Sequence, residues 1–333
     1  MRVLGSHIPG FRHENAGNAA CMPELGFALS SEDHVPNRLV DQAALAEQTG
    51  FTFCLISDHY HPWISKQGHS PFVWATLGGI ARATSTIRVG TGVTCPLIRQ
   101  HPGLVAHAAA TVGCMLDGRF FLGVGTGEQL NEHVFGDRWP APDERLEMLE
   151  EAVAVMRLLW QGGEQTHRGT HYTVDRAQVF DIPDGGIDVY VAAAQPNAAE
   201  LAGRIGDGLI STSPDEEVVK KFGQDKPKLA MMHVAYDTDR DAALKRAHEL
   251  WPNTSLRGSL SQELPTPSDF EKAAPMVSPA DVAESTPHGP DPEPYLEQIR
   301  KFEQAGFTHV YIHQIGENQK EFCEWAAQNL LTG

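Results

Sequence analysis

Basic residues, long apolar runs and signal-like segments are all scarce in this sequence. Its 333 residues include 26 Lys and Arg against 43 Asp and Glu, which gives a net charge of −17. This balance argues against nucleic acid and anionic membranes as partners, because both are bound through clustered basic side chains. No apolar run approaches the roughly 20 residues that span a bilayer. Residues 1–24 lack the apolar core of a secretion signal, and we expect them to form an N-terminal extension.

Paired cysteine motifs are also missing. The five cysteines are odd in number, scattered along the chain and without CxxC spacing: Cys21, Cys54, Cys95, Cys114 and Cys323. Such usage is typical of a reduced protein, so the sequence predicts a cytoplasmic location.

The glycine-rich stretch "GVGTGE" lacks the features of the two common nucleotide-binding motifs. Glu128 stands where a dinucleotide fingerprint needs its third glycine after Gly123 and Gly125, and no Gly-Lys-Ser/Thr follows. The glycines still permit a close backbone approach to something flat or charged.

A metal site is not predicted either. His59 and His61 form an HxH pair, but the later strand ends offer no histidine or cysteine where further ligands are needed. We interpret His233 as a core residue in the middle of a strand, and His313 as standing alone beyond the last strand.

Eight short apolar and β-branched runs are present, and amphipathic stretches separate them. The predicted strands are residues 25–29, 53–57, 87–93, 119–125, 189–193, 208–212, 229–236 and 308–312. Near-continuous apolar strands that alternate with amphipathic helices indicate a parallel sheet covered by helices. A doubly wound open sheet is the alternative, but eight units favour a single (β/α)₈ barrel over residues 25–333. The Pro- and Ser-rich segment from about 251 to 290 predicts a long insertion between the seventh and eighth strands.

Polar side chains cluster after the first four predicted strands. In a (β/α)₈ barrel the active site lies at the carboxyl ends of the strands, so we expect these residues to meet there: Glu32, Asp58, His59, Trp63, Cys95, Glu128 and Asn131. The alternative for "DHYHPW" is a structural loop in which Asp58 caps the backbone and Trp63 only packs. A histidine titrates near neutrality and suits a base that takes a hydroxyl proton, and a nearby carboxylate can fix its tautomer.

Several separate blocks resemble one known group of enzymes. "ISDHYHPW", "RVGTGVTCP", "GRFFLGVGTGEQLNEH", "AGRIGDG" and "LISTS" are similar to the coenzyme F420-dependent glucose-6-phosphate dehydrogenases of the bacterial luciferase-like superfamily. The match is collinear from about Leu25 to Ser213 and continues more weakly to the C-terminus. The resemblance implies a homodimeric (β/α)₈ barrel that binds a deazaflavin across its C-terminal face. It further implies hydride transfer from an alcohol carbon to C5 of the deazaflavin.

The resemblance also implies roles for individual residues. His59 is similar to the base that takes the hydroxyl proton, Trp63 to the residue that flanks the reacting carbon, and Glu128 to the group that handles the proton near N1 of the ring. Asp58 and Glu32 resemble acids that orient this set. The positions implied to contact the cofactor are Asp58, Gly92, Val93, Cys95, Thr126, Gly127, Asn131, Ala193 and Ala194, with a non-proline cis peptide at Gly92–Val93.

The predicted substrate site departs from this group. Its members grip a phosphate with two lysines and an arginine, and these positions fall on Asp215, near Ser261 and near Ser285. Because an acid repels phosphate, we expect a neutral sugar, another secondary alcohol, or the reverse reduction of a ketone or enone. Arg257 could compensate, which would leave an F420-dependent glucose-6-phosphate dehydrogenase. Further alternatives are an FMN-dependent monooxygenase and a non-catalytic flavin-binding barrel.

Overall fold

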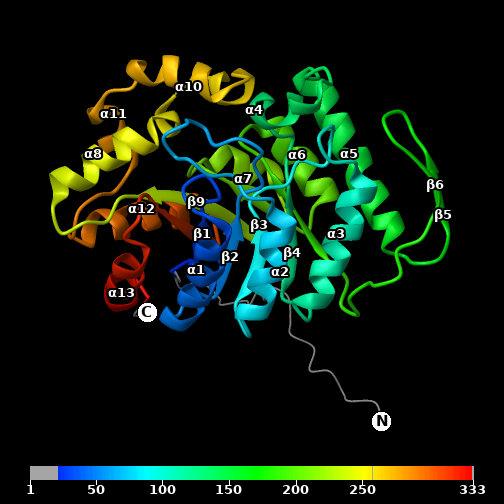
Figure 1. Ribbon diagram of the computed structural model, residues 1–333, viewed down its shortest axis with the longest axis horizontal. Helices are drawn as coiled ribbons and strands as arrows, with labels where there is room; N and C mark the ends of the chain where they lie inside the picture. Colours follow the sequence, from blue (N-terminus) through cyan, green and yellow to red (C-terminus); the bar gives the residue numbers. More distant parts are fainter. Residues whose placement is uncertain (1–21, 257, 332–333) are drawn as a thin grey trace, which may run out of the picture.

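The protein folds into a closed barrel of eight parallel strands surrounded by helices, as the sequence predicts (Figure 1). The computed structural model describes residues 22–256 and 258–331. Around the barrel the strands follow the order β1-β10-β9-β8-β7-β4-β3-β2. Their bounds are β1 (Glu24–Leu29), β2 (Phe53–Ile56), β3 (Arg88–Thr91), β4 (Phe120–Val124), β7 (Asp188–Ala192), β8 (Gly208–Ser211), β9 (Lys228–Val234) and β10 (His309–Gln314).

The helices that follow the strands form the outer layer. They are α1 (Pro36–Thr49), α2 (Val73–Ala83), α3 (Pro102–Met115), α4 (Gln129–Glu132), α5 (Pro142–Leu159), α6 (Pro196–Ile205), α7 (Glu216–Phe222), α8 (Arg240–Leu250), α12 (Glu293–Gln304) and α13 (Gln319–Asn329). The first helix shows how local sequence sets their limits. Pro36 occupies the first turn of α1, and Gly50 ends it with φ 104°, a left-handed conformation that glycine adopts without strain.

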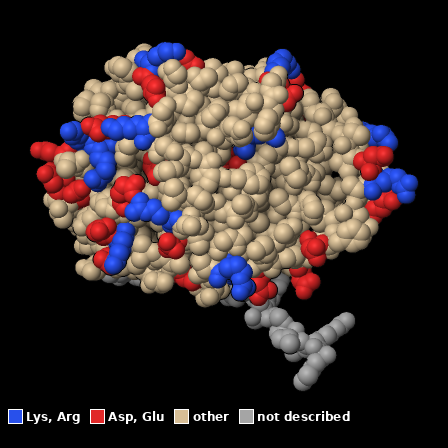
Figure 2. All heavy atoms as spheres, viewed as in Figure 1, with Lys and Arg blue, Asp and Glu red and all other residues tan. Residues whose placement is uncertain are grey.

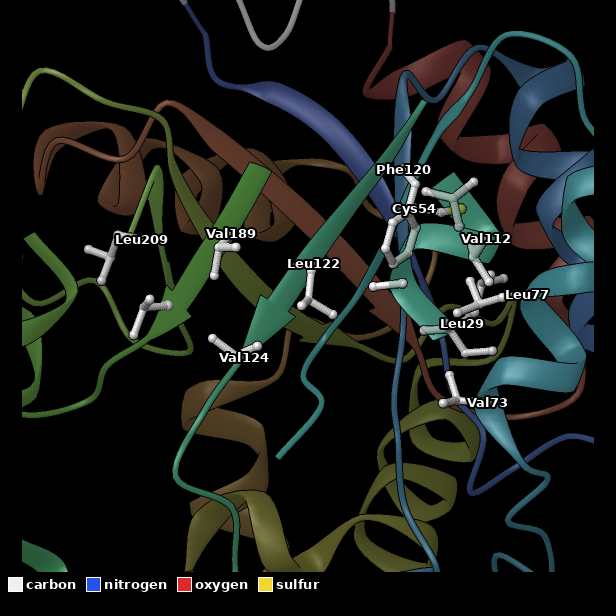
Figure 3. Packing of buried hydrophobic residues seen from close by; sticks show 14 of the residues in the cluster. Leu29, Cys54, Val73, Leu77, Val112, Phe120, Leu122, Val124, Val189 and Leu209 are labelled. Atoms are coloured by element: carbon white, nitrogen blue, oxygen red, sulfur yellow. The ribbon is translucent and has the colours of Figure 1, made fainter. Parts of the chain in front are cut away.

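Two apolar layers stabilise the barrel. Between strands and helices, strand side chains such as Leu122 and Val189 and helix side chains such as Val73 and Leu77 of α2 belong to one continuous cluster (Figure 3). Inside the barrel a second cluster contains aromatic rings, among them Phe121. Gly90 makes room for that ring, because a Cβ at this position would run into Phe121.

The predicted insertion lies between β9 and β10. Beyond α8 it contains η2 (Pro252–Ser255), α9 (Leu260–Glu263), α10 (Pro267–Ala273), η3 (Ala274–Met276) and α11 (Pro279–Ser285). Helix α9 packs against α4, so the insertion covers the end of the barrel where the polar strand ends meet (Figure 1).

A two-stranded hairpin of β5 (Gln165–Arg168) and β6 (Thr173–Ala177) stands at the right edge of Figure 1 and was not predicted. Its strands are short and polar, so they carry none of the apolar pattern that marks the barrel strands.

Three sequence predictions remain untested by the fold. The division at residue 24 stays a prediction, and so do the cellular compartment and the role of Arg257, which lies outside the described residues. Within the described ranges, no helix is both long and apolar enough to cross a membrane. Cys54, Cys95, Cys114 and Cys323 are free thiols.

Candidate active site

His59 lies between two carboxylates at the carboxyl end of β2. Its Nδ1 is 3.1 Å from Glu32 Oε1, and its Nε2 is 3.2 Å from Glu128 Oε1. The Nδ1 contact does not meet hydrogen-bond geometry, so it rests on distance and charge. The ring edge of His59 also meets Trp63, with centroids 5.1 Å apart. The structure therefore brings together four residues predicted from the ends of three strands.

Glu32 is held so that one of its oxygens is left for His59. Its Oε2 accepts hydrogen bonds from Ser30 Oγ at 2.9 Å and Ser57 Oγ at 2.8 Å. The side chain is buried, with 3% of it exposed. A carboxylate fixed in this way favours a proton on the nearby Nδ1 and leaves Nε2 as the base.

Asp58 is buried beside this set but does not bond to His59. Its Oδ2 accepts hydrogen bonds from Thr94 Oγ1 and Gln100 Nε2, both at 2.8 Å, and its Oδ1 pairs with Arg99 at 3.0 Å. Asp58 thus ties the ends of β2 and β3 together, and Glu32 is the carboxylate that faces the imidazole.

Asn131 connects the loop after β2 to Glu128. Its Oδ1 accepts the backbone N–H groups of Tyr60 and His61 at 2.7 and 2.9 Å, and its Nδ2 donates to Glu128 Oε1 at 2.7 Å. Both ends of the amide are engaged within the protein, and Asn131 is not among the described residues that line the cleft. Asn131 thus positions Glu128, and its predicted contact with the cofactor stays a prediction.

Glu132 and Arg99 belong to the same network and were not predicted. Arg99 Nε lies 3.2 Å from Glu132 Oε1, and the pair is almost completely buried. Burial raises the pKa of Glu132 to about 7, although the guanidinium of Arg99 acts in the opposite direction. Glu132 directly follows Asn131 in "GEQLNEH", so its position in that block was the available signal.

Two adjoining chambers, each of about 370 Å³, form the cleft at this end of the barrel. They share Trp63, Gly92, Val93, Gly127, Glu128, Thr212, Met231, Ser261 and Tyr311. The first chamber adds the small side chains Thr126, Ala193 and Ala194. The predicted cis peptide at Gly92–Val93 is present in the wall. Backbone and small side chains thus form a slot that suits a flat ring.

The second chamber extends from His59 towards the ends of β9 and β10, and His233 and His313 line it. Their Nδ1 atoms are 2.8 Å apart. The interpretation of His233 as a core residue and of His313 as solitary is therefore wrong. The two residues are register partners on adjacent strands, and side-chain alternation along a strand does not show that a partner stands beside it.

Cys95 is buried in the wall of the second chamber, against Gly127. Burial raises the pKa of its thiol well above the usual value, so the thiol stays protonated.

The predicted phosphate-grip positions separate in the structure. Ser261 lines both chambers, whereas Asp215 is the N-cap of α7 and accepts the backbone N–H groups of Glu217 and Val218. Neither Asp215 nor Ser285 is among the described residues of the cleft wall. The carboxylate of Asp215 therefore has a structural role as a helix cap, and its predicted contact with the substrate stays a prediction.

The second histidine of the HxH pair is turned to the protein. His61 Nδ1 is 3.1 Å from the carbonyl oxygen of Leu130. In the part of the chain that the structure describes, no group of three or more His, Cys, Asp or Glu side chains could hold a metal ion.

Comparison with known proteins places this site in context. Residues 19–309 match the model of a family described as luciferase-like monooxygenase. An F420-dependent glucose-6-phosphate dehydrogenase from Nocardia farcinica is 36% identical over 325 residues, covering 92% of this chain and 96% of the relative. The F420-dependent glucose-6-phosphate dehydrogenase 1 of Rhodococcus jostii is 37% identical, with 92% and 97% covered.

A solved structure shares the whole barrel. An F420-dependent secondary alcohol dehydrogenase in complex with an F420-acetone adduct superposes with a TM-score of 0.86 at 26% identity, covering 93% of this chain and 98% of the other.

Proposed function

Because the chain belongs to the luciferase-like monooxygenase family, we propose that it is an oxidoreductase dependent on coenzyme F420. It transfers a hydride between an alcohol carbon and C5 of the deazaflavin. The observation that carries this proposal is the position of His59, held between Glu32 and Glu128 beside Trp63 at the wall of a cleft.

The slot fits a deazaflavin ring. Its wall combines the Gly92–Val93 peptide, Thr126 and Gly127 with Ala193 and Ala194, so little side-chain bulk stands in the way of a flat ring. Gly127 has φ 70°, which lets the backbone turn at the wall without strain. These residues would hold the cofactor, which when bound accepts the hydride of the alcohol carbon.

The chain's own residues move the proton. His59 Nε2 takes the proton of the substrate hydroxyl as the carbonyl forms, and Glu32 stabilises the resulting imidazolium from the Nδ1 side. Glu128 Oε1 is fixed by Asn131 and lies 3.2 Å from Nε2, so it can hold a proton at the wall of the slot. Trp63 packs on Phe270 of the insertion, with ring centroids 5.2 Å apart, and keeps water from one side of the reacting carbon.

The substrate is bound without the usual phosphate grip. Ser261 stands in the wall where the resemblance implies a lysine, and the cleft near His59 carries Glu32, Glu128 and Glu132. A glucose-6-phosphate dehydrogenase proper is the second candidate, favoured by the names of the relatives at 36% and 37% identity.

We also propose a homodimer. Large apolar side chains are exposed on and beside α2 and α3: Phe72 (59% exposed), Leu104 (56%) and Met115 (43%). Few charged side chains cover this part of the face seen in Figure 2. Light scattering at micromolar protein is expected to give twice the 36.4 kDa mass of the chain, and a monomer would contradict this proposal.

An F420 reduction assay tests the proposed activity. Purified protein with oxidised F420 is expected to bleach the cofactor when a secondary alcohol or sugar is added, and to restore it with the matching ketone. An FMN-dependent monooxygenase would instead consume oxygen with reduced FMN, and a non-catalytic barrel would bind a flavin without turnover.

A further inference from the structure

The wall of the second chamber at β9 and β10 contains a chain of polar groups that the hydride-transfer mechanism does not use. Asp33 Oδ2 accepts a hydrogen bond from Trp251 Nε1 at 2.8 Å and lies 3.5 Å from His313 Nε2. His313 Nδ1 is in turn 2.8 Å from His233 Nδ1. Trp251 packs against both imidazoles, with ring centroids 5.5 Å from His233 and 4.5 Å from His313.

The chain fixes which atom faces the chamber as an acceptor. Two Nδ1 atoms at 2.8 Å share one proton, so one ring donates and the other accepts. The contact between Asp33 Oδ2 and His313 Nε2 does not meet hydrogen-bond geometry, but the charge of the carboxylate favours a proton on that nitrogen, which leaves His313 Nδ1 as the acceptor and His233 Nδ1 as the donor. Burial and the neighbouring His313 lower the pKa of His233 well below its usual value, so the ring is neutral. His233 Nε2 is then a bare acceptor, and it has no hydrogen-bond partner among the described residues.

A second unpaired group lines the same chamber. Asn253 follows Trp251 in η2 and is 8% exposed, and its amide Oδ1 has no hydrogen-bond partner in residues 22–256 and 258–331. A buried amide without a partner costs free energy unless a ligand or water satisfies it. Asn131 differs, because its Oδ1 and its Nδ2 both have hydrogen-bond partners within the protein. The Oδ1 of Asn253 is therefore available to accept a hydrogen bond from a ligand.

The charged residues of the second chamber limit the class of ligand that can bind there. Its lining includes Glu32 and Glu128 together with Asp58 and Glu132, whose shared partner Arg99 offsets part of their charge, and no Lys or Arg is found among the lining residues that the structure describes. An anionic group would meet repulsion here, whereas a hydroxyl can donate a hydrogen bond to an imidazole nitrogen or an amide oxygen.

We propose that His233 and Asn253 recognise a second hydroxyl group of the substrate, with His313 and Asp33 as positioning residues that set the acceptor state of His233. The preferred substrate is thus an uncharged polyol, such as a diol or a free sugar. This inference rests on the proposed function, because it places the reacting hydroxyl at His59 in the same chamber.

A pair of alcohols that differ by one hydroxyl tests the proposal. With the wild-type protein and F420, kcat/KM is expected to be on the order of tenfold higher for 2,3-butanediol than for 2-butanol, as one lost hydrogen bond implies. His233→Phe is expected to remove this preference by raising KM for the diol more than KM for 2-butanol. His233→Gln keeps an acceptor and is expected to restore part of the preference. Asn253→Leu is expected to act in the same direction as His233→Phe.

The control is His107→Phe, which changes an exposed histidine of α3 that is not among the described residues of the chamber lining. Equal wild-type rates with the two alcohols would overturn the proposal. So would an equal loss on both alcohols in His233→Phe, because a purely structural role produces that pattern.

Binding without turnover separates this inference from the proposed function. Saturation-transfer NMR with D-glucose and the cofactor-free protein is expected to show binding that weakens in His233→Phe and not in His107→Phe. If that pattern holds while no alcohol bleaches F420, the proposed function fails and the recognition stands. If alcohols bleach F420 but glucose binds equally well to the wild type and to His233→Phe, the proposed recognition fails and the proposed function stands.

Discussion

The two sides of the cleft differ in how completely their polar groups are satisfied. At the ends of β1 to β4, Oε2 of Glu32 and both oxygens of Asp58 have hydrogen-bond partners within the protein, and His59 Nδ1 has the charge of Glu32 Oε1 at 3.1 Å. On the other side, Nε2 of His233 in β9 and Oδ1 of Asn253 in η2 have no hydrogen-bond partner among the described residues. A satisfied network holds its side chains in one geometry, which suits the reaction centre, whereas unsatisfied groups are available to a substrate.

The largest effect is expected at the reaction centre. His59→Ala should lower kcat by about 10²–10⁴-fold, because general-base catalysis is lost, while F420 affinity stays nearly unchanged. Steady-state rates and fluorescence titration of F420 measure the two quantities. His61→Ala is the matched control on the same loop and should retain activity. Wild-type kcat in His59→Ala would show that another group takes the proton.

The next effect concerns the stability of the satisfied network. Asp58→Ala leaves Arg99 buried with a missing partner and should lower the free energy of unfolding by about 3–5 kcal/mol. Asp175 offers a matched control, because it also lies 3.0 Å from an arginine, Arg168, but the pair is exposed. Asp175→Ala should cost less than about 1 kcal/mol. Urea unfolding gives both values, and equal losses would contradict the difference between buried and exposed pairs.

His34 belongs to neither side, and its buried ring has no hydrogen-bond partner among the described residues. Burial lowers its pKa from 6.5 to about 4, so the unfolded chain binds a proton between these values while the folded protein does not. The stability contributed by neutral His34 is present above pH 6.5 and is lost as the pH falls towards 4, on the order of 3 kcal/mol.

His34→Phe lacks this contribution, so its stability should fall less than that of the wild type when unfolding is measured at pH 7, 5.5 and 4.5. His107→Phe should leave the slope unchanged. A wild-type slope in His34→Phe would mean that other groups cause the loss at acid pH.

The smallest effect concerns how poorly the cleft binds a phosphorylated substrate. Wild-type protein should use glucose-6-phosphate poorly, and Ser261→Lys should raise kcat/KM for it by roughly tenfold through one charge-assisted contact. Asp215→Lys should not, because Asp215 caps α7 away from the described lining. Efficient wild-type turnover at micromolar glucose-6-phosphate would support a dehydrogenase of the sugar phosphate.

The eight strands were predictable because each barrel strand is a short apolar run buried on both faces. The hairpin β5–β6 was not, since "QTHR" and "TVDRA" offer no apolar pattern. The short helices of the insertion were also missed, because "PSDFEKA" and "PADVAES" begin with proline and span two turns or fewer, so composition there predicts a loop.

The reaction centre was predictable because strand ends meet at one face of a barrel. Glu32, His59 and Glu128 indeed converge. The hydrogen-bond partner of each polar group was not predictable. Asn131 bonds to Glu128, and Glu132, one residue later, lines the cleft. The pairing of His233 with His313 depends on the register between β9 and β10, which the long insertion separates so that the two residues are 80 apart in sequence.

The central claim is that this cleft binds a deazaflavin for hydride transfer. Isothermal titration of the purified protein with oxidised F420 and, separately, with FMN tests it most directly. F420 is expected to bind at least tenfold tighter than FMN, a difference of about 1.4 kcal/mol. Tighter binding of FMN, or binding of neither, would contradict it.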